Sequence, residues 1–221
     1  MGPPLGIFGG TFDPVHLGHL RMAQELADAL ALVEVRIVPA AQPPHRAQPR
    51  CTAQQRLDML RLAIADNPLF VLDPCELERN GPSYTVDTLT ELRASLGPES
   101  PLCLFVGADA FNGLPGWHRW ESLIRLAHLV IAHRPGASLQ LSSLAEPLQQ
   151  LWQRHHTTDP RQLHRQAAGC LLQHRITALD ISASQIRHLL HQGKSCRYLL
   201  PEPVRDYIDQ HHLYESPPHA S

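Results

Sequence analysis

The sequence predicts an α/β fold in which helices cover both faces of a doubly wound parallel sheet. Short apolar runs alternate with stretches of helical periodicity through residues 1–135, which is typical of such a sheet. The first apolar run leads through a glycine-rich loop directly into a helix, and the run at 102–106 is apolar throughout, as in a central strand. We therefore expect a Rossmann-like architecture, whose ligand binds beyond the strand ends where the strand order reverses.

The expected strands are short apolar runs bounded by glycine, proline or helical stretches. They are residues 5–8, 33–38, 69–72, 102–106, 128–132 and 175–179. Helices are expected from helical spacing of apolar residues, and two of them begin with capping boxes, Thr52 with Gln55 and Ser182 with Gln185. The expected helices are residues 16–30, 52–67, 86–97, 182–193 and 201–208, with a short one that ends near residue 126.

The remaining stretches lack periodicity and are expected to be irregular. Residues 39–49 hold four prolines and predict a loop, and residues 73–81 are irregular as well. Residues 137–173 are interpreted as an excursion from the sheet, with one helical stretch near 141–148 and an exposed polar section at 153–166. One domain is expected over residues 1–214, followed by a frayed tail at 215–221.

Composition limits the class of protein. The chain has 221 residues, of which 43% are hydrophobic and 18% charged, enough for one full α/β core. Its net charge is −2, so no overall basic field argues for binding to nucleic acid or to a membrane. No apolar run reaches the length of a membrane span, and the N-terminus lacks the basic and apolar segments of a signal peptide.

Cysteine and histidine usage argues against a metal centre or a disulfide framework. The five cysteines are widely spaced and form no Cys-x-x-Cys pair, so we expect reduced thiols in a cytoplasmic protein. The fifteen histidines include two adjacent pairs, whose members cannot share a helix face, and these are expected on the surface. No feature of the sequence indicates an oligomeric state.

The stretch around which the chain is organised is the signature loop, residues 9–19, which reads Gly-Gly-Thr-Phe-Asp-Pro-Val-His-Leu-Gly-His. It joins the first strand to the first helix. Glycine lets a backbone approach a ligand closely, and a helix N-terminus offers unpaired N–H groups to an anion. His16 and His19 are three residues apart near that end and can both donate hydrogen bonds to phosphate oxygens. The loop therefore predicts a polyphosphate site.

A second anion-binding stretch, residues 181–187, reads Ile-Ser-Ala-Ser-Gln-Ile-Arg and opens a later helix. Its hydroxyl groups and helix N-terminus can meet a triphosphate from the other side. Arg187 is not needed for a helix cap, and the planar fork of its guanidinium suits phosphate.

The signature loop and five further strings, in this order, resemble the bacterial nicotinate-nucleotide adenylyltransferases of the nucleotidyltransferase superfamily. The further strings lie at residues 82–89, 107–109, 117–121, 133–136 and 181–187, and the resemblance runs from about residue 5 to residue 214. It implies that ATP and nicotinate mononucleotide react to give deamido-NAD and pyrophosphate by direct in-line adenylyl transfer. It also implies Mg²⁺, held mainly by the ATP phosphates and water, with Asp13 and Asp109 as the nearest water-mediated helpers.

The resemblance also assigns roles to individual residues. His16, His19 and Arg187 would carry the reaction, with His19 closest to the transferred group. The residues that would bind ATP are Gly9, Gly10, Thr11, Phe12, His16, His19, Asp109, Ser184 and Arg187. Those that would bind nicotinate mononucleotide are Thr85, Trp117, His45, Arg46 and Arg134. Trp117 would stack on the pyridine ring, and Thr85 would lie near the nicotinate carboxylate.

Three other functions stay open at the level of sequence. The first is an adenylyltransferase that prefers nicotinamide mononucleotide or accepts both substrates. The second is another adenylyl- or cytidylyltransferase, against which the strings around Trp117 and Arg187 argue. The third is a non-catalytic nucleotide-binding regulator, which would usually lack a signature histidine or carry an added domain.

Overall fold

The computed structural model describes residues 2–43, 48–133, 141–177 and 179–215. Within these ranges the strands form one seven-stranded sheet in the order β3-β2-β1-β4-β5-β7-β6, and every neighbouring pair is parallel. The strands are β1 Leu5–Gly10, β2 Glu34–Pro39, β3 Phe70–Leu72, β4 Leu102–Gly107, β5 His128–His133, β6 His156–Thr157 and β7 Leu171–Arg175. The predicted α/β class with a doubly wound parallel sheet is confirmed.

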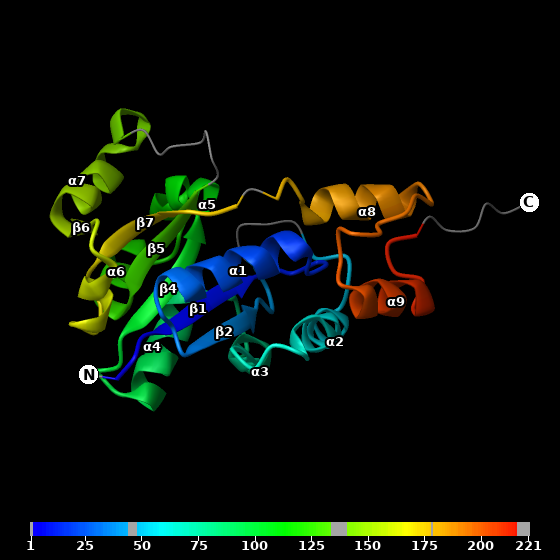
Figure 1. Cartoon of the computed structure of the whole chain (residues 1–221), viewed down its shortest axis with the longest axis horizontal. Helices are drawn as coiled ribbons and strands as arrows, with labels where there is room; N and C mark the ends of the chain where they lie inside the picture. Colours follow the sequence, from blue (N-terminus) through cyan, green and yellow to red (C-terminus); the bar gives the residue numbers. More distant parts are fainter. Residues whose placement is uncertain (1, 44–47, 134–140, 178, 216–221) are drawn as a thin grey trace, which may run out of the picture.

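Helices connect the strands and cover the sheet. The α-helices are α1 Leu17–Ala29, α2 Ala53–Ile64, α3 Cys75–Glu78, α4 Thr85–Leu96, α5 Ala108–Asn112, α6 Leu123–Leu126, α7 Glu146–His155, α8 Ala183–His191 and α9 Glu202–Gln210. Short 3₁₀ turns lie at Leu114–Gly116, Trp120–Ser122, Leu141–Ser143 and Pro160–His164. Figure 1 shows α1 across the near face of the sheet, α2, α8 and α9 gathered at one end, and α6 and α7 at the other.

The two faces of the sheet are buried in two separate cores because successive side chains of a strand point to opposite sides. In β4, Cys103 and Phe105 belong to a core that includes buried residues of α1, α2, α8 and α9. Leu102, Leu104 and Val106 belong to the other, with buried residues of α4, α5, α6 and α7. Burial on both sides explains why β4 is apolar at every position, as the sequence predicted.

The strand order reverses between β1 and β4, and this places the signature loop. β1 pairs with β2 on one side and with β4 on the other, so chain connections leave the sheet in opposite directions from this point. The carboxyl ends of β1 and β4 lie at the same edge because the strands are parallel. Ligands of open α/β sheets bind at such a reversal, and here the signature loop and the turn after Gly107 occupy it.

The strand expected at residues 175–179 is wrong, and so is the interpretation of residues 137–173 as an excursion from the sheet. The last strand inside the sheet is β7, not residues 175–179, and β6 and β7 both begin within the supposed excursion. The strand ends early because the N–H of Ile176 still pairs with the carbonyl of His133, whereas that of Thr177 bonds to the Glu25 side chain. The polar section 153–166 is not wholly exposed either, since Leu163 is buried.

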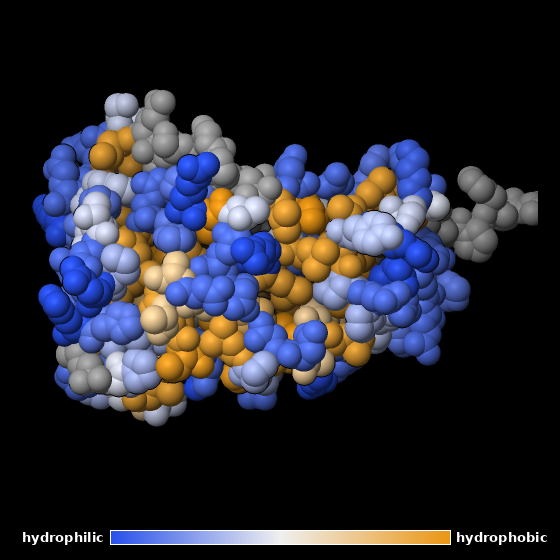
Figure 2. Space-filling view, in the orientation of Figure 1, coloured by the Kyte–Doolittle hydropathy of each residue, from blue (hydrophilic) through white to orange (hydrophobic). Residues whose placement is uncertain are grey.

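The other expected elements are confirmed to within a few residues, with one of the two expected capping boxes complete and the other half formed. Thr52 and Gln55 form a complete capping box, and the Ser182 side chain accepts the N–H of Gln185. The short helices α3 and α5 were not expected. None of the helices in the described ranges is long and apolar enough to cross a membrane. In the space-filling view, hydrophilic residues cover both ends of this face and hydrophobic ones show across its middle (Figure 2).

Candidate active site

The signature loop turns the chain from β1 into α1. Phe12 adopts a left-handed backbone with φ of 50° and buries its ring against Phe8, the ring centroids lying 5.4 Å apart. His16 is not on the helix face, as the spacing suggested, but is the N-cap residue of α1 with an extended backbone. The loop is thereby fixed from below by aromatic packing and leads into a helix N-terminus that His16 caps.

His16 and His19 hold each other through a reciprocal capping box. The Nδ1 of His19 accepts the backbone N–H of His16, and the Nδ1 of His16 accepts that of His19, each at 3.3 Å. The two rings stack with centroids 3.6 Å apart. Because an Nδ1 that accepts a hydrogen bond carries no proton, the proton of each neutral ring lies on Nε2. Each ring is therefore set up to donate from Nε2, which is the atom that a phosphate oxygen needs.

Two glycines of the signature loop make room for the rings of Phe12 and His16. A Cβ on Gly10 would lie 2.8 Å from the ring of Phe12, closer than side chains tolerate. A Cβ on Gly18 would lie 3.1 Å from Nδ1 of His16, against the ring that caps the helix. Glycine at position 10 is therefore a packing requirement of the Phe12 ring, and a side chain at position 18 would press on the ring that caps the helix.

Asp13 is the centre of a buried network beneath the loop. Its carboxylate accepts the backbone N–H groups of Arg50 at 2.8 Å and Cys51 at 3.3 Å, and the hydroxyl of Tyr214 at 2.7 Å. Its carbonyl oxygen accepts Nη1 of Arg187 at 2.7 Å. One residue thus ties the signature loop to the start of α2, to α8 and to the C-terminal segment. With two protein donors on one oxygen and one on the other, Asp13 serves as a structural anion.

A buried arginine supports the same loop from α2. Arg56 is 1% exposed and donates from Nη1 to the carbonyl of Thr11 at 2.7 Å. Burial lowers the pKa of its guanidinium, and the negative charge of Asp13 opposes this shift, so the group stays charged. Burial also raises the pKa of Tyr214 above its usual range and that of Cys51 to about 11, so both remain protonated.

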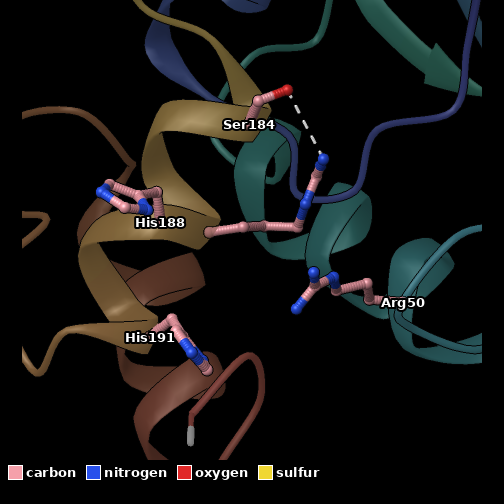
Figure 3. A pocket seen from close by; sticks show the side chains of 5 residues that line it. Arg50, Ser184, His188 and His191 are labelled. Carbon is pink, nitrogen blue, oxygen red and sulfur yellow. Dashed lines mark hydrogen bonds between the residues drawn. The ribbon is translucent and has the colours of Figure 1, made fainter.

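Helix α8 brings the second stretch against the first. Arg187 donates from Nη1 to the carbonyl oxygen of Asp13 and from Nη2 to the hydroxyl oxygen of Ser184, the latter at 3.5 Å. Both residues line a pocket of about 290 Å³ beside α8, together with Arg50, His188 and His191. In Figure 3, Arg50 points from a separate segment toward α8, from which Ser184 and His191 project. The pocket therefore joins a hydroxyl, two guanidinium groups and two imidazoles.

The strings assigned to the mononucleotide meet at the start of α4. The Ser83 hydroxyl accepts the N–H groups of Ala41 at 2.8 Å and Gln42 at 3.1 Å, which fastens the loop after β2. The ring of Tyr84 stacks on that of His118, with centroids 4.3 Å apart. These contacts bring together the chain segments that contain Thr85 and Trp117, which are both partly buried.

The remaining assigned residues divide into two groups. Asp109 is exposed in the first turn of α5, directly after β4, where the strand order reverses. Gly9 and Thr11 lie on the signature loop at the same edge. His45, Arg46 and Arg134 lie outside the described residues. In the part of the chain that the structure describes, no group of three or more His, Cys, Asp or Glu side chains could hold a metal ion.

Reasoning from sequence missed several residues of this region. They are Arg50, Arg56, Ser83, His191 and Tyr214. Arg56 could have been found, since it lies four residues before Leu60 on the apolar stripe of α2, where a charge must have a buried partner. Tyr214 and Arg50 had no local signal, because their contacts come from distant parts of the chain.

Comparisons with known proteins agree with one another. The family model for cytidylyltransferase-like proteins matches residues 7–189. The chain is 53% identical over 216 residues to a Dechloromonas aromatica protein named "Probable nicotinate-nucleotide adenylyltransferase", covering 98% of this chain and 100% of that one. It is 46% identical over 217 residues to a Pseudomonas aeruginosa protein of the same name, again covering 98% and 100%.

Solved structures show the same fold at low sequence identity. The Plasmodium falciparum nicotinic acid mononucleotide adenylyltransferase complexed with NaAD superposes with a TM-score of 0.72 at 17% identity, over 96% of this chain and 98% of that one. The same enzyme complexed with APC gives a TM-score of 0.69 at 18% identity over the same shares.

Proposed function

The chain belongs to the nicotinate-nucleotide adenylyltransferases, within the cytidylyltransferase-like family, and we propose that it joins ATP to nicotinate mononucleotide in the synthesis of deamido-NAD. The observation that carries this proposal is the meeting of two helix starts at Asp13. Helix α1 contributes the two stacked histidines, and α8 contributes Ser184 and Arg187. Two helix N-termini with cationic and donor side chains suit a triphosphate held between them.

In the proposed reaction, a phosphate oxygen of nicotinate mononucleotide attacks the α-phosphorus of ATP. A new P–O bond forms as the bond between the α-phosphorus and the bridging oxygen breaks, and its electron pair leaves with pyrophosphate. The nucleophile is already an anion, so no side chain has to remove a proton from it. The protein must hold two anions in line and neutralise charge on the leaving group, and positioning of this kind can supply roughly 7–11 kcal/mol.

We assign the signature histidines to the reacting phosphates. The Nε2–H groups of His16 and His19 would donate to the α- and β-phosphate oxygens, where negative charge grows as the bond breaks. Main-chain groups of Gly9, Gly10, Thr11 and Phe12 would line the same space. Ser184 and Arg187 would hold the outer phosphates, and Asp109 would contact the ribose of ATP.

We assign the other half of the site to the mononucleotide. Trp117 would stack on the pyridine ring, and Thr85, at the first position of α4, would lie near the carboxylate. The stack of Tyr84 on His118 supports this assignment, because it fixes both segments side by side. His45, Arg46 and Arg134 remain assigned to phosphate contacts from the sequence alone.

We propose that Mg²⁺ is bound mainly by the phosphates of ATP and by water. We do not assign Asp13 as a direct ligand of the ion, because its carboxylate already accepts three hydrogen bonds from the protein. Asp109 is the carboxylate at this edge that could reach a metal-bound water. When bound, the ion would neutralise charge on the departing pyrophosphate. The five thiols are all free, which supports a reducing compartment, and we propose the cytoplasm.

The test is pyrophosphate release from ATP and Mg²⁺, with nicotinate mononucleotide, nicotinamide mononucleotide or phosphopantetheine as acceptor. We expect release with the nicotinate compound and little with the other two. Equal release with acid and amide would establish dual specificity and remove the claim that the site reads a carboxylate. Release with none, while ATP still binds, would indicate a nucleotide-binding regulator.

A further inference from the structure

We propose that Arg56 is a positioning residue for adenylyl transfer: its guanidinium holds two peptide groups and so turns a main-chain donor of the signature loop toward the phosphates of ATP. The two are the peptide group between Thr11 and Phe12 and the one between Ala41 and Gln42. The inference rests on the proposed function and deepens it, since it assigns a role in the reaction to a residue that contacts neither substrate. Arg56 lies in α2, outside every sequence string that indicated the function.

The guanidinium of Arg56 joins the signature loop to the loop after β2. Arg56 is 1% exposed, so its donors face the protein interior. Nη1 donates to the carbonyl oxygen of Thr11 at 2.7 Å, and Nη2 donates to that of Ala41 at 3.4 Å. Hydrogen bonds from a charged donor are roughly twice as strong as neutral ones, and the rigid fork holds both acceptors at once. Arg56 therefore fixes where the two loops lie relative to each other.

These contacts also set the direction of the N–H group in each peptide. In a planar trans peptide the carbonyl and the N–H point in opposite directions. Because Arg56 binds the carbonyl of Thr11, the N–H of Phe12 is directed away from Arg56. Within the described ranges no protein group accepts this N–H. It is one of the main-chain donors assigned above to ATP, and Arg56 sets its direction.

The second peptide shows what lies opposite the fork where the protein itself supplies the acceptor. Arg56 binds the carbonyl of Ala41, and the N–H of Gln42 donates to the hydroxyl oxygen of Ser83 at 3.1 Å. The same hydroxyl oxygen accepts the N–H of Ala41 at 2.8 Å. The N–H of Phe12 has no such acceptor among the described residues, and a phosphate oxygen of ATP can take that place.

Packing in the core does not account for an arginine at this position. The Nε of Arg56 is buried and finds no acceptor within the described part of the chain. A buried donor without an acceptor costs free energy, and so does desolvation of the charge, which also lowers the pKa of the guanidinium. Methionine is flexible enough to fill the same space without these costs. What methionine lacks is the fork that holds two carbonyls, and this is the property to test.

The direction of the Phe12 N–H matters most as the bond to pyrophosphate breaks. Negative charge then grows on the phosphate oxygens, and a donor already aimed at them forms a stronger hydrogen bond. An interaction that strengthens only in the transition state raises kcat and leaves KM unchanged. Loss of the Arg56 fork should therefore lower kcat with little effect on the KM of either substrate.

The kinetic experiment compares wild-type protein with Arg56→Met and Arg56→Lys by pyrophosphate release from ATP and nicotinate mononucleotide. We expect Arg56→Met to lower kcat roughly 10- to 100-fold, less than the removal of a preorganised donor, because the N–H remains but is misdirected. Both KM values should stay within about twofold of wild type. Arg56→Lys keeps the charge but not the fork, and its kcat should lie between those of Arg56→Met and wild type.

The matched control is Leu60→Ala, one turn further along α2. Leu60 is 0% exposed and belongs to the core beneath the same helix, so its truncation also destabilises α2. Urea unfolding should show a lower midpoint for this variant, whereas its kcat and both KM values should match wild type at a temperature where it is folded. A wild-type kcat in folded Arg56→Met, or an equal fall of kcat in Leu60→Ala, overturns the inference.

A spectroscopic measurement on wild-type protein tests the donor itself and does not depend on the folding of a variant. The chain has one Thr-Phe dipeptide, so ¹³C in the threonine carbonyls and ¹⁵N in the phenylalanine amides single out the peptide between Thr11 and Phe12. ATP with Mg²⁺ should move the amide proton signal of Phe12 downfield, and the movement should be smaller in Arg56→Lys. An unmoved signal in wild-type protein that binds ATP overturns the inference. A signal that moves in protein that releases no pyrophosphate with any acceptor would instead overturn the proposed function and leave the orienting role of Arg56 standing.

Discussion

At the scale of single residues, His19 combines two roles that a substitution can separate. Its Nδ1 completes the capping box of α1, and its Nε2 is assigned to a phosphate of ATP. We expect His19→Ala to lower kcat by roughly 10²–10³-fold, the usual effect of losing one preorganised donor. It should also lower the free energy of unfolding by about 1 kcal/mol through loss of the cap.

A second substitution distinguishes the two roles. Glutamine at the third position of a helix can complete a capping box, so His19→Gln should recover the stability that His19→Ala loses. Its kcat should stay low, because its amide cannot place a donor where Nε2 of the stacked ring lies. Turnover near the wild-type value in this variant would mean that the cap geometry, and not the imidazole, is what the reaction requires. Steady-state kinetics and urea unfolding measure the two effects.

His128, unlike His19, is assigned no contact with a substrate and is a buried histidine that stays neutral. Its Nδ1 accepts the N–H of Cys170 at 3.0 Å, and its Nε2 lies 2.9 Å from the carbonyl of Gln166. Burial lowers its pKa to about 4, helped by the charge of Arg93 and opposed by the hydrogen bond to Gln166. The tautomer that satisfies both contacts is neutral, because protonation of Nδ1 would place two donors face to face.

The pH dependence of stability follows from this shift. The unfolded chain binds a proton at this histidine near pH 6.5, whereas the folded chain does so only near pH 4. The contribution of neutral His128 to the free energy of unfolding is therefore fully present above pH 6.5. It is lost as the pH falls toward 4, by roughly 3 kcal/mol in total. Chemical unfolding at several pH values should show a smaller loss in His128→Gln than in wild type. Parallel curves for the two proteins would contradict the assignment.

At the scale of elements, the N-terminus of α1 is held by parts of the chain far away in sequence. The N–H of Leu17 pairs with the carbonyl of Leu199, in the segment between α8 and α9. The hydroxyl of Tyr214 reaches the carboxylate of Asp13 from beyond α9. The C-terminal segment is thus part of the framework of the signature loop.

Tyr214→Phe tests this role of the C-terminal segment. It removes a buried hydrogen bond to a charged group, and we expect the free energy of unfolding to fall by about 2 kcal/mol. Tyr198→Phe is the matched control, since Tyr198 is 83% exposed, and it should change stability by less than about 0.5 kcal/mol. Equal stabilities of the two variants in urea unfolding would show that the contact with Asp13 contributes nothing.

These elements also show what local sequence can and cannot predict. Strands, caps and the signature loop depend on neighbouring residues, so spacing alone located β1, α1, α2 and α8. β7 was misplaced because its second half carries the polar residues Gln173 and His174, whereas the apolar Ile176 that follows lies outside it. The contacts of Asp13 with Arg50 and Tyr214 join distant segments, and no spacing in the sequence encodes them.

At the scale of the whole molecule, the region once interpreted as an excursion lies at the end opposite the helices that carry the phosphate half of the proposed site (Figure 1). Figure 1 places α7 at the end of the molecule opposite α8 and α9. α7 packs on the sheet through Leu148, which is fully buried in the core shared with α4, α5 and α6. The region that contains α7, β6 and β7 therefore completes the sheet and its core.

This separation predicts a change in stability without a change in substrate binding. Leu148→Ala leaves a cavity and should lower the free energy of unfolding by about 2–5 kcal/mol. The KM for ATP and for nicotinate mononucleotide should stay at wild-type values at a temperature where the variant is folded, because the truncation removes buried core atoms and none of the residues assigned to either substrate. Leu141→Ala is the control, as Leu141 is 42% exposed, and it should change neither quantity. If Leu148→Ala raises either KM by tenfold or more, α7 is coupled to the site through the sheet, and its role extends beyond the core.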